Sequence, residues 1–154
     1  MYQIMTTKTE WGNACWFLFH TAAAKINENN IEMIRPLLDV ILYVCRHLPC
    51  PVCSEHAINS FKLLRIEKIN SKDKLIDCLL QFHNSVNSRT KKQHFTRAEC
   101  DNKYNHLHLS RVFNIWANIM AKNMPGRNML YSMSRNKMIT DVKKFFIDNQ
   151  QSFY

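Results

Sequence analysis

Apolar residues recur every three or four positions along most of this chain, which is the period of an α-helix buried on one side. Trp11, Cys15, Leu18 and Ala22 form one such series, and comparable series follow nearly to the C-terminus. The pattern predicts an all-α fold. The expected helices cover residues 10–27, residues 30–47, a segment that opens at Cys50-Pro51, a segment that opens at Ser71, residues 96–104 with an extension as far as 116, and residues 129–149.

Local signals mark several helix ends. Ser71 is a favourable N-cap, and Thr96 with Glu99 has the sequence of a capping box. Pro36 either kinks the second helix or lies in its first turn, and Pro125-Gly126 interrupts the pattern near the C-terminus. The two glycines and four prolines are too few for the many turns of an all-β protein. We therefore expect a single domain over residues 1–154, a four-helix bundle with additional short helices.

Composition adds information about partners and compartment. The chain is 46% hydrophobic, and 21 Lys+Arg against 12 Asp+Glu give a formal net charge of +9, which favours an anionic partner. The N-terminal residues lack the basic and apolar parts of a secretory signal, and no apolar stretch is long enough to span a membrane. Six cysteines without a signal favour metal or redox chemistry, while buried, inert thiols are the third interpretation.

The strongest local motif is Cys50-Pro51-Val52-Cys53, placed at a helix start. Two cysteines at this spacing can form a disulfide, and the helix N-terminus with Arg46 and His47 would stabilise a reactive thiolate. By itself, the motif supports redox, zinc and structural interpretations comparably.

Two alternatives for this motif are less favoured. A zinc site would combine Cys50, Cys53 and His56 with a fourth ligand, but the second compact ligand pair of structural zinc sites is missing. The candidates for the fourth ligand are Cys100, His106 and His108. A thioredoxin-like redox site would need β-strands around the motif, and the sequence shows no convincing strand.

Two further motifs suit a bound ligand. The segment His83-Asn-Ser-Val-Asn87 places imidazole and amide groups on one helix face, and the basic segment Arg89–Lys92 follows it. Trp16 and His20 lie four residues apart and so share a helix face. These groups fit a ligand with a heterocycle at one end and phosphates at the other. The alternatives are a satisfied polar pair in the core for the histidine motif and ordinary core packing for Trp16.

In their order and spacing, these motifs resemble the Erv/ALR family of flavin-dependent sulfhydryl oxidases over residues 11–104. The resemblance is carried by Trp11-Gly12, Trp16 with His20, Leu48-Pro-Cys-Pro-Val-Cys53, His83-Asn-Ser-Val-Asn87, Lys92 and Phe95. The segment Leu48–Ala57 is most similar to members encoded by large DNA viruses. The resemblance implies a sulfhydryl oxidase core over residues 10–104 that holds FAD non-covalently in a helical bundle. Residues 105–154 would then form a helical C-terminal extension.

The resemblance also implies roles for individual residues. Cys50 would be the thiol that the substrate attacks, and Cys53 the thiol beside the flavin. No metal ligand is expected. The residues expected to bind FAD are Trp16, His20, His83, Asn84, Val86, Asn87, Lys92 and Tyr104, to which we add Arg89 as a phosphate contact on grounds of charge.

The implied activity is disulfide formation in protein substrates, with electrons passing through the CxxC disulfide and FAD to oxygen and giving hydrogen peroxide. The expected partners are a protein dithiol or a thioredoxin-like relay protein, and a second copy of the chain in a homodimer. A viral member would act in the host cytoplasm or the virion, on virion proteins. The main alternative is a non-enzymatic basic module that binds nucleic acid through its helices, with zinc-bound or structural cysteines. Its basic residues are dispersed and form no recognisable nucleic-acid-binding motif, which speaks against it.

The sequence departs from the family pattern at a few positions. Asn13 stands where many cellular members carry arginine, and Gln93 where they carry proline. Cys78 lies five residues before His83 rather than three, so pairing of Cys78 with Cys100 and two separate thiols are both open alternatives.

The remaining cysteines and the C-terminal residues have a simpler interpretation. Cys15 and Cys45 lie on apolar helix faces, where we expect buried, inert thiols. The basic side chains of residues 105–154 are expected to form a solvated face. An oligomer contact and a surface for an acidic partner are the alternatives for that face.

Overall fold

The computed structural model describes residues 7–122 and 129–153, which fold into helices without any β-strand beyond one isolated bridge. The helices are α1 (Lys8–Lys25), α2 (Ile34–Arg46), α3 (Pro51–Leu63), α4 (Lys72–Arg89), α5 (Arg97–Tyr104), α6 (Leu109–Ala121) and α7 (Met129–Asp148). Short 3₁₀ helices occupy Ile31–Met33, Ile66–Lys68 and Gln150–Ser152. The expectation of an all-α fold is confirmed.

The expected capping signals operate where the sequence places them. The Ser71 hydroxyl accepts a hydrogen bond from the Lys74 N–H at the start of α4. Thr96 and Glu99 form both bonds of a capping box at the start of α5. Each satisfies N–H groups that the first helical turn leaves without a partner. Pro36 lies in the first turn of α2, where its missing N–H costs nothing, so it does not kink the helix.

One expected continuation is wrong. The helix that starts after Thr96 ends at Tyr104, and a separate helix begins at Leu109 instead of continuing to residue 116. The chain changes direction in between, which allows α5 to pack on α4 while α6 runs along α1. The break expected at Pro125-Gly126 lies outside the described residues.

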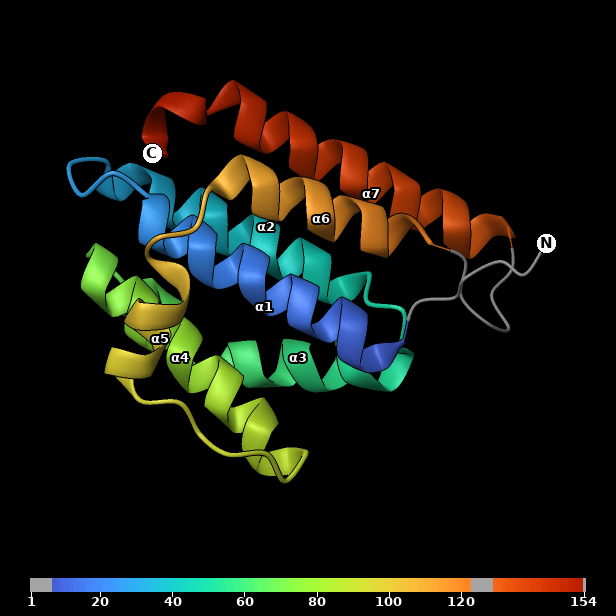
Figure 1. The fold of residues 1–154 in the computed structure, drawn as a ribbon, viewed down its shortest axis with the longest axis horizontal. Coiled ribbons are helices and arrows are strands. Elements are labelled where there is room, and N and C mark those ends of the chain that lie inside the picture. The colour runs from blue at the N-terminus through green and yellow to red at the C-terminus, as the bar shows by residue number, and fades with distance from the viewer. Residues whose placement is uncertain (1–6, 123–128, 154) are drawn as a thin grey trace.

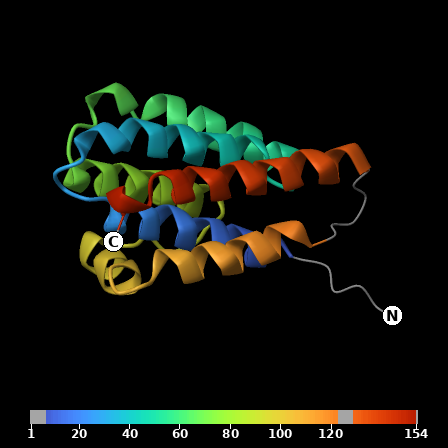
Figure 2. The same ribbon diagram turned by 90° about the horizontal axis from the view of Figure 1, so that it is seen from above.

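Helix α1 lies in the middle of the arrangement (Figure 1). Helix α6 packs along it, and α7 packs on α6 and α2. On the other side, α4 and α5 pack on α1, and α3 packs on α2 and α4. Figure 2 shows α1 beside α6, and α2 beside α3. Within the described residues, no helix is both long and apolar enough to cross a membrane.

The core runs through these layers without interruption. Leu79, Val44, Trp116, Met120 and Met138 come from four different helices, and each is 0% exposed. The C-terminal end is attached to the turn after α1, because Asn27 donates a backbone hydrogen bond to the Ser152 carbonyl oxygen over 2.8 Å. Helices α6 and α7 are therefore part of the packed bundle.

The basic residues of these two helices are of two kinds. Lys137 and Lys144 are exposed and pair with acidic residues four positions later, as expected for a solvated face. Arg135 contradicts that expectation because its side chain is buried. Its Nε donates a 2.7 Å hydrogen bond to the Met120 carbonyl oxygen, and Nη2 reaches the Lys122 carbonyl oxygen at 3.3 Å. The guanidinium thus satisfies carbonyl groups at the C-terminal end of α6.

Four cysteines are free and buried, namely Cys15, Cys45, Cys78 and Cys100. The expected burial of Cys15 and Cys45 is confirmed. Burial raises the pKa of the Cys15 thiol to about 12 and that of Cys45 still further above its ordinary value, which keeps both protonated and unreactive. Cys78 and Cys100 are separate thiols in this structure rather than a disulfide.

Candidate functional site

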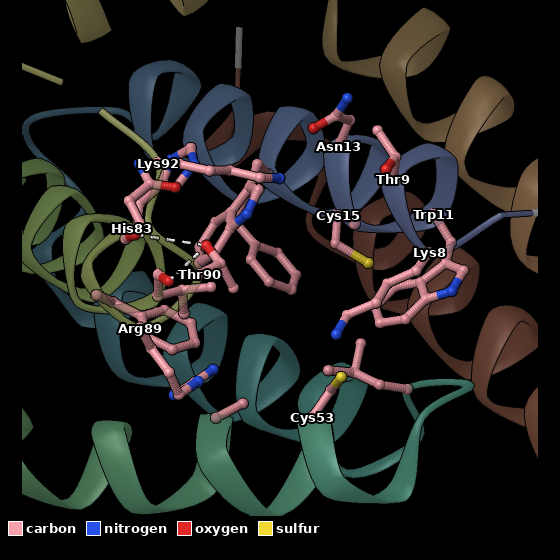
Figure 3. A pocket seen from close by; sticks show the side chains of 18 of the residues that line it. Lys8, Thr9, Trp11, Asn13, Cys15, Cys53, His83, Arg89, Thr90 and Lys92 are labelled. Carbon is pink, nitrogen blue, oxygen red and sulfur yellow. Dashed lines mark hydrogen bonds between the residues drawn. The ribbon is translucent and has the colours of Figure 1, made fainter. Parts of the chain in front are cut away.

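A cavity of about 820 Å³ opens between α1, α3, α4 and α5. Its size lies within the range of pockets that bind cofactors and other small molecules. Helix α1 supplies one wall, and the C-terminal half of α4 with the loop after it supplies another. Figure 3 shows His83, Arg89, Thr90 and Lys92 along one side, and Trp11, Cys15 and Cys53 toward the other end.

A disulfide between Cys50 and Cys53 forms part of the cavity wall. Cys50 is the N-cap of α3 and Pro51 is its first residue, a position where proline is favoured. The Cys53 N–H donates a hydrogen bond to Cys50 Sγ over 3.2 Å. The N-terminus of α3 therefore points at the Cys50 sulfur and would stabilise negative charge there once the disulfide is reduced.

The residues before this disulfide are held by α2 and α7. Tyr131 on α7 donates a 2.8 Å hydrogen bond from its hydroxyl to the Leu48 carbonyl oxygen. Tyr43 on α2 donates its hydroxyl to Asp141 on α7, also over 2.8 Å. The His47 ring lies 2.8 Å from the Tyr43 carbonyl oxygen through Nδ1. The connection that positions Cys50 is thus attached to α7, which lies outside residues 10–104.

Aromatic and imidazole rings form the inner wall of the cavity. Trp16 stacks on His83 with ring centres 4.0 Å apart and planes 10° from parallel. His20 lies behind His83, and its Nε2 is 3.0 Å from Nδ1 of His83. His20 in turn stacks on Tyr104 at 4.5 Å. These contacts fix the planes of both imidazole rings.

Both histidines are neutral near pH 7. Burial lowers the pKa of His20 to about 3, helped by the neighbouring His83 and Lys103. Burial also lowers the pKa of His83 to about 4, helped by the positive charges of Lys103 and Lys92. Each ring therefore carries one N–H donor and one nitrogen acceptor.

Two asparagines of α4 hold the loop that forms the cavity edge. The Asn84 amide donates to the Phe95 carbonyl oxygen and accepts from the Phe95 N–H, both over 2.9 Å. Asn87 donates to the Gln93 carbonyl oxygen over 3.2 Å. The amide groups thus satisfy loop backbone that could not pair within a helix.

The end of α4 turns the chain back toward the cavity. Lys92 donates its N–H to the Asn87 carbonyl oxygen, and Lys91 donates to Ser88, which together form a Schellman motif. Lys91 adopts φ of 57°, the left-handed conformation that this motif requires. The reversal places Lys92 on the cavity wall.

Positive side chains surround the rim of the cavity. Lys8 lines it from the start of α1, Arg89 and Lys92 from the end of α4 and the loop after it, and Lys103 from α5. Lys103 Nζ lies 5.0–5.6 Å from the ring centres of Phe17, Phe95 and Tyr104, within cation–π range. The cavity therefore combines an aromatic interior with a cationic rim, which suits a ligand that has a flat ring system and anionic groups.

Most of the residues expected at a site lie on this cavity. Its lining includes Cys50, Cys53, Trp16, His83, Val86, Asn87, Arg89, Lys92 and Tyr104. His20 and Asn84 are not among the lining residues. His20 supports His83 from behind, and Asn84 holds the Phe95 backbone. These two act on the cavity through other residues.

The sequence interpretation missed several lining residues. Trp11, Cys15 and Gly12 line the cavity from α1, and their helical spacing with Trp16 was the available signal. Lys103 carries no local signal, because its place over three rings depends on how α5 packs against α1 and on the fold of the loop after α4.

The candidate fourth zinc ligand Cys100 lies against His20, with Sγ 3.5 Å from Nδ1. In the part of the chain that the structure describes, no three His, Cys, Asp or Glu side chains form a group that could hold a metal ion.

Comparisons with known proteins agree with this geometry. A family model described as Erv1 / Alr family matches residues 13–105. A protein of Invertebrate iridescent virus 3, named "Putative FAD-linked sulfhydryl oxidase 096R", is 30% identical over 84 residues, covering 53% of this chain and 57% of that relative. "Putative FAD-linked sulfhydryl oxidase 088R" of Frog virus 3 is 29% identical over 93 residues, covering 56% of this chain and 60% of the relative. The chain thus spans little more than half the length of these relatives. No solved structure matches it.

Proposed function

Because this chain belongs to the Erv1/Alr family, we propose that it is an FAD-dependent thiol oxidase that forms disulfide bonds in protein substrates. The observation that carries the proposal is the Cys50–Cys53 disulfide in the wall of a cavity with an aromatic interior and a cationic rim. A redox-active disulfide needs an electron acceptor within contact distance, and this cavity provides a place for one. The names of the two viral relatives support the same activity.

The cavity fits a flavin nucleotide. Its volume of about 820 Å³ suits a cofactor-sized ligand. Gly12 lies inside helix α1, where glycine is unfavourable, yet a Cβ at this position would meet no atom within 4 Å. The protein's own packing therefore gives no reason for a glycine here, whereas a ligand lying against this face of α1 would. FAD also carries two phosphates, which match the cationic rim.

Substrate oxidation begins at Cys50. A substrate thiolate attacks Cys50 Sγ, the Cys50–Cys53 bond breaks, and Cys53 leaves as a thiolate. A second substrate thiolate then attacks the substrate sulfur of the mixed disulfide, which releases the oxidised substrate and leaves Cys50 as a thiolate. The N-terminus of α3 stabilises that leaving sulfur through the Cys53 N–H. The two electrons of the substrate dithiol now reside on Cys50 and Cys53.

When bound beside Cys53, FAD would accept these two electrons and pass them to oxygen, which becomes hydrogen peroxide. The side chains of this cavity would bind and orient the group. We assign Trp16, His83, Val86 and Tyr104 to its ring systems. Arg89 and Lys92, with Lys103 and Lys8, are assigned to its phosphates. His20, Asn84 and Asn87 hold these contacts in place through His83 and the loop at Gln93–Phe95.

The substrate is proposed to be a protein dithiol, presented directly or by a thioredoxin-like relay protein. Because both relatives come from viruses, we propose that the enzyme acts on virion proteins in the host cytoplasm or the virion. We also propose that two copies of the chain form a homodimer. Nucleic acid is not part of this proposal.

Purification and oxygen measurements test the function. The full-length protein should be yellow with a flavin spectrum, and it should consume oxygen when given dithiothreitol. Cys53→Ser should keep the flavin and lose turnover, whereas Cys78→Ala is the matched control because Cys78 is buried away from the cavity. A colourless protein that binds no added FAD would contradict the proposal, as would full oxygen consumption by Cys53→Ser.

A further inference from the structure

A buried series of polar contacts leads from α5 through α1 to the cavity. Cys100 Sγ lies 3.5 Å from His20 Nδ1, and His20 Nε2 lies 3.0 Å from His83 Nδ1. The three side chains come from three helices, and the residues are only 3%, 3% and 5% exposed. The second nitrogen of His83, Nε2, has no hydrogen-bond partner among the described residues, and His83 lines the cavity. The series therefore ends at the ligand site.

Rotation of the rings is restricted. His83 is stacked on Trp16, and His20 is stacked on Tyr104. Both rings are neutral because burial and nearby lysine charges lower their pKa values. Burial raises the pKa of Cys100 to about 11, so this side chain keeps its S–H proton. One proton lies between the two rings, bonded either to His20 Nε2 or to His83 Nδ1.

Two proton arrangements satisfy the contact between the histidines. In the first, the Cys100 S–H donates to His20 Nδ1, His20 donates its Nε2–H to His83 Nδ1, and His83 carries its proton on Nε2. In the second, every donor is reversed, so that His20 donates Nδ1–H to the Cys100 sulfur and His83 Nε2 has no proton. A thiol is a weak donor and a weak acceptor, but an imidazole nitrogen is a strong acceptor. The S–H···N contact is therefore the better of the two, which favours the first arrangement.

We propose that Cys100 is a positioning residue that holds the His20–His83 pair in one tautomer, so that His83 presents a neutral Nε2–H donor to an acceptor atom of the ligand in the cavity. The identification of that ligand as a flavin nucleotide rests on the proposed function. A neutral donor discriminates by geometry, because it pairs with a ring nitrogen, a carbonyl oxygen or a hydroxyl without adding charge. The lysines and Arg89 would supply charge separately at the rim.

Nuclear magnetic resonance of the full-length protein tests the tautomer. Two-bond ¹H–¹⁵N correlations of ¹⁵N-labelled histidine rings distinguish Nε2–H from Nδ1–H, and a His83→Gln spectrum identifies the His83 signals by their loss. The wild-type protein should show His83 as the Nε2–H form, both with and without added FAD. Cys100→Ser keeps a donor and should keep this form. Cys100→Ala and Cys100→Val remove the donor and should produce the Nδ1–H form or a mixture.

Flavin affinity provides a second measurement. Cys100→Ala should raise the Kd for FAD by roughly two- to tenfold, the effect of one weakened hydrogen bond. Cys100→Ser should stay near the wild-type Kd. Cys78→Ala is the matched control, because it removes another buried thiol that has no contact with either histidine in the described structure, and it should leave the tautomer and Kd unchanged.

The outcomes separate this inference from the proposed function. An Nδ1–H form of His83 in the wild-type protein overturns the inference even if FAD binds and turnover is normal. An unchanged tautomer or Kd in Cys100→Ala removes Cys100 from the positioning role. If the protein binds no FAD, the proposed function fails, and the flavin-free spectra still decide the tautomer. If the Cys100 variants do not fold, the wild-type spectrum still decides the tautomer of His83.

Discussion

The two sides of helix α1 are built differently. Toward α2 and α7, the space lined by Leu18, Ala22 and Phe146 amounts to about 10 Å³, barely enough for a single water molecule. Toward α3, α4 and α5, Gly12 and Trp16 border a cavity of about 820 Å³. One side is filled by the chain's own side chains, and the other has room for a ligand. We call the side of α1 toward α2, α6 and α7 the packed side, and the side toward α3, α4 and α5 the cavity side.

This difference indicates where stability and function reside. The packed side has apolar side chains with exposed fractions near zero, so substitutions there should affect folding. The cavity side contains buried histidines, positive charges and a glycine within a helix, all of which cost stability unless a ligand compensates. Substitutions there should affect ligand binding more than folding.

The largest expected effect is on the packed side. Trp116 on α6 is 0% exposed and belongs to the core between α1 and α6. Trp116→Ala should lower the free energy of unfolding by about 3–5 kcal/mol, because it leaves a cavity in close-packed surroundings. Urea denaturation monitored by circular dichroism measures this loss. A loss below about 1 kcal/mol would contradict the assignment of this side as the close-packed core.

Acid should destabilise the protein through the cavity side. The pKa values of His20 and His83 fall from 6.5 to about 3 and about 4 on folding. Below about pH 6.5 the unfolded chain therefore binds protons that the folded chain does not. The free energy of unfolding thus decreases as the pH decreases, by up to about 1.4 kcal/mol per pH unit for each histidine. No such loss is expected above pH 6.5.

Unfolding measured by urea at several pH values tests this dependence. His83→Gln should reduce the acid slope by about half, since one of the two buried titrations is removed. Trp116→Ala should leave the slope unchanged, because it lowers stability equally at every pH. An identical slope in His83→Gln would show that the carboxylates, and not this pair, control acid unfolding.

The sequence predicted local features better than distant contacts. Ser71, Thr96 and Pro51 begin helices through interactions within a few residues, so their roles are visible in the sequence. The capping box of Thr7 and Glu10 is equally local, and it was missed. Trp16 and His83 were predicted as site residues from the order of the motifs and from the family resemblance. Their direct stacking could not be predicted in this way, because it depends on the packing of α1 against α4.

Contacts between distant segments could not be predicted. Cys100 and His20 are 80 residues apart, and their contact depends on how α5 packs against α1, which no local pattern shows. Arg135 looked like one more solvated basic residue, because nothing local to it indicates that it would meet the end of α6. The individual FAD contacts, including those assigned to Trp16 and Lys92, stay predictions.

A glycine substitution separates stability from binding on the cavity side. Gly12→Ala should raise the stability of the flavin-free protein by up to about 1 kcal/mol, because alanine favours helix and its methyl group meets no protein atom. The same methyl group enters the cavity and should weaken FAD binding. Thermal unfolding and FAD titration measure the two effects. Ala22→Gly is the counterpart on the packed side, and it should lower stability without changing FAD affinity.

The smallest expected effect, on stability alone and not on FAD binding, concerns the loop at the cavity edge. Lys91 adopts φ of 57°, which costs a residue with a side chain about 1 kcal/mol relative to glycine. Lys91→Gly should therefore raise the free energy of unfolding by up to about 1 kcal/mol. Lys91→Ala removes the same charge but keeps the strain, so it should leave stability near the wild-type value. Because Lys91 does not line the cavity, neither variant should change FAD affinity. Weaker binding in Lys91→Gly alone would mean that the strained turn itself holds Lys92 in position, and the cavity side would then depend on backbone strain as well as on side chains.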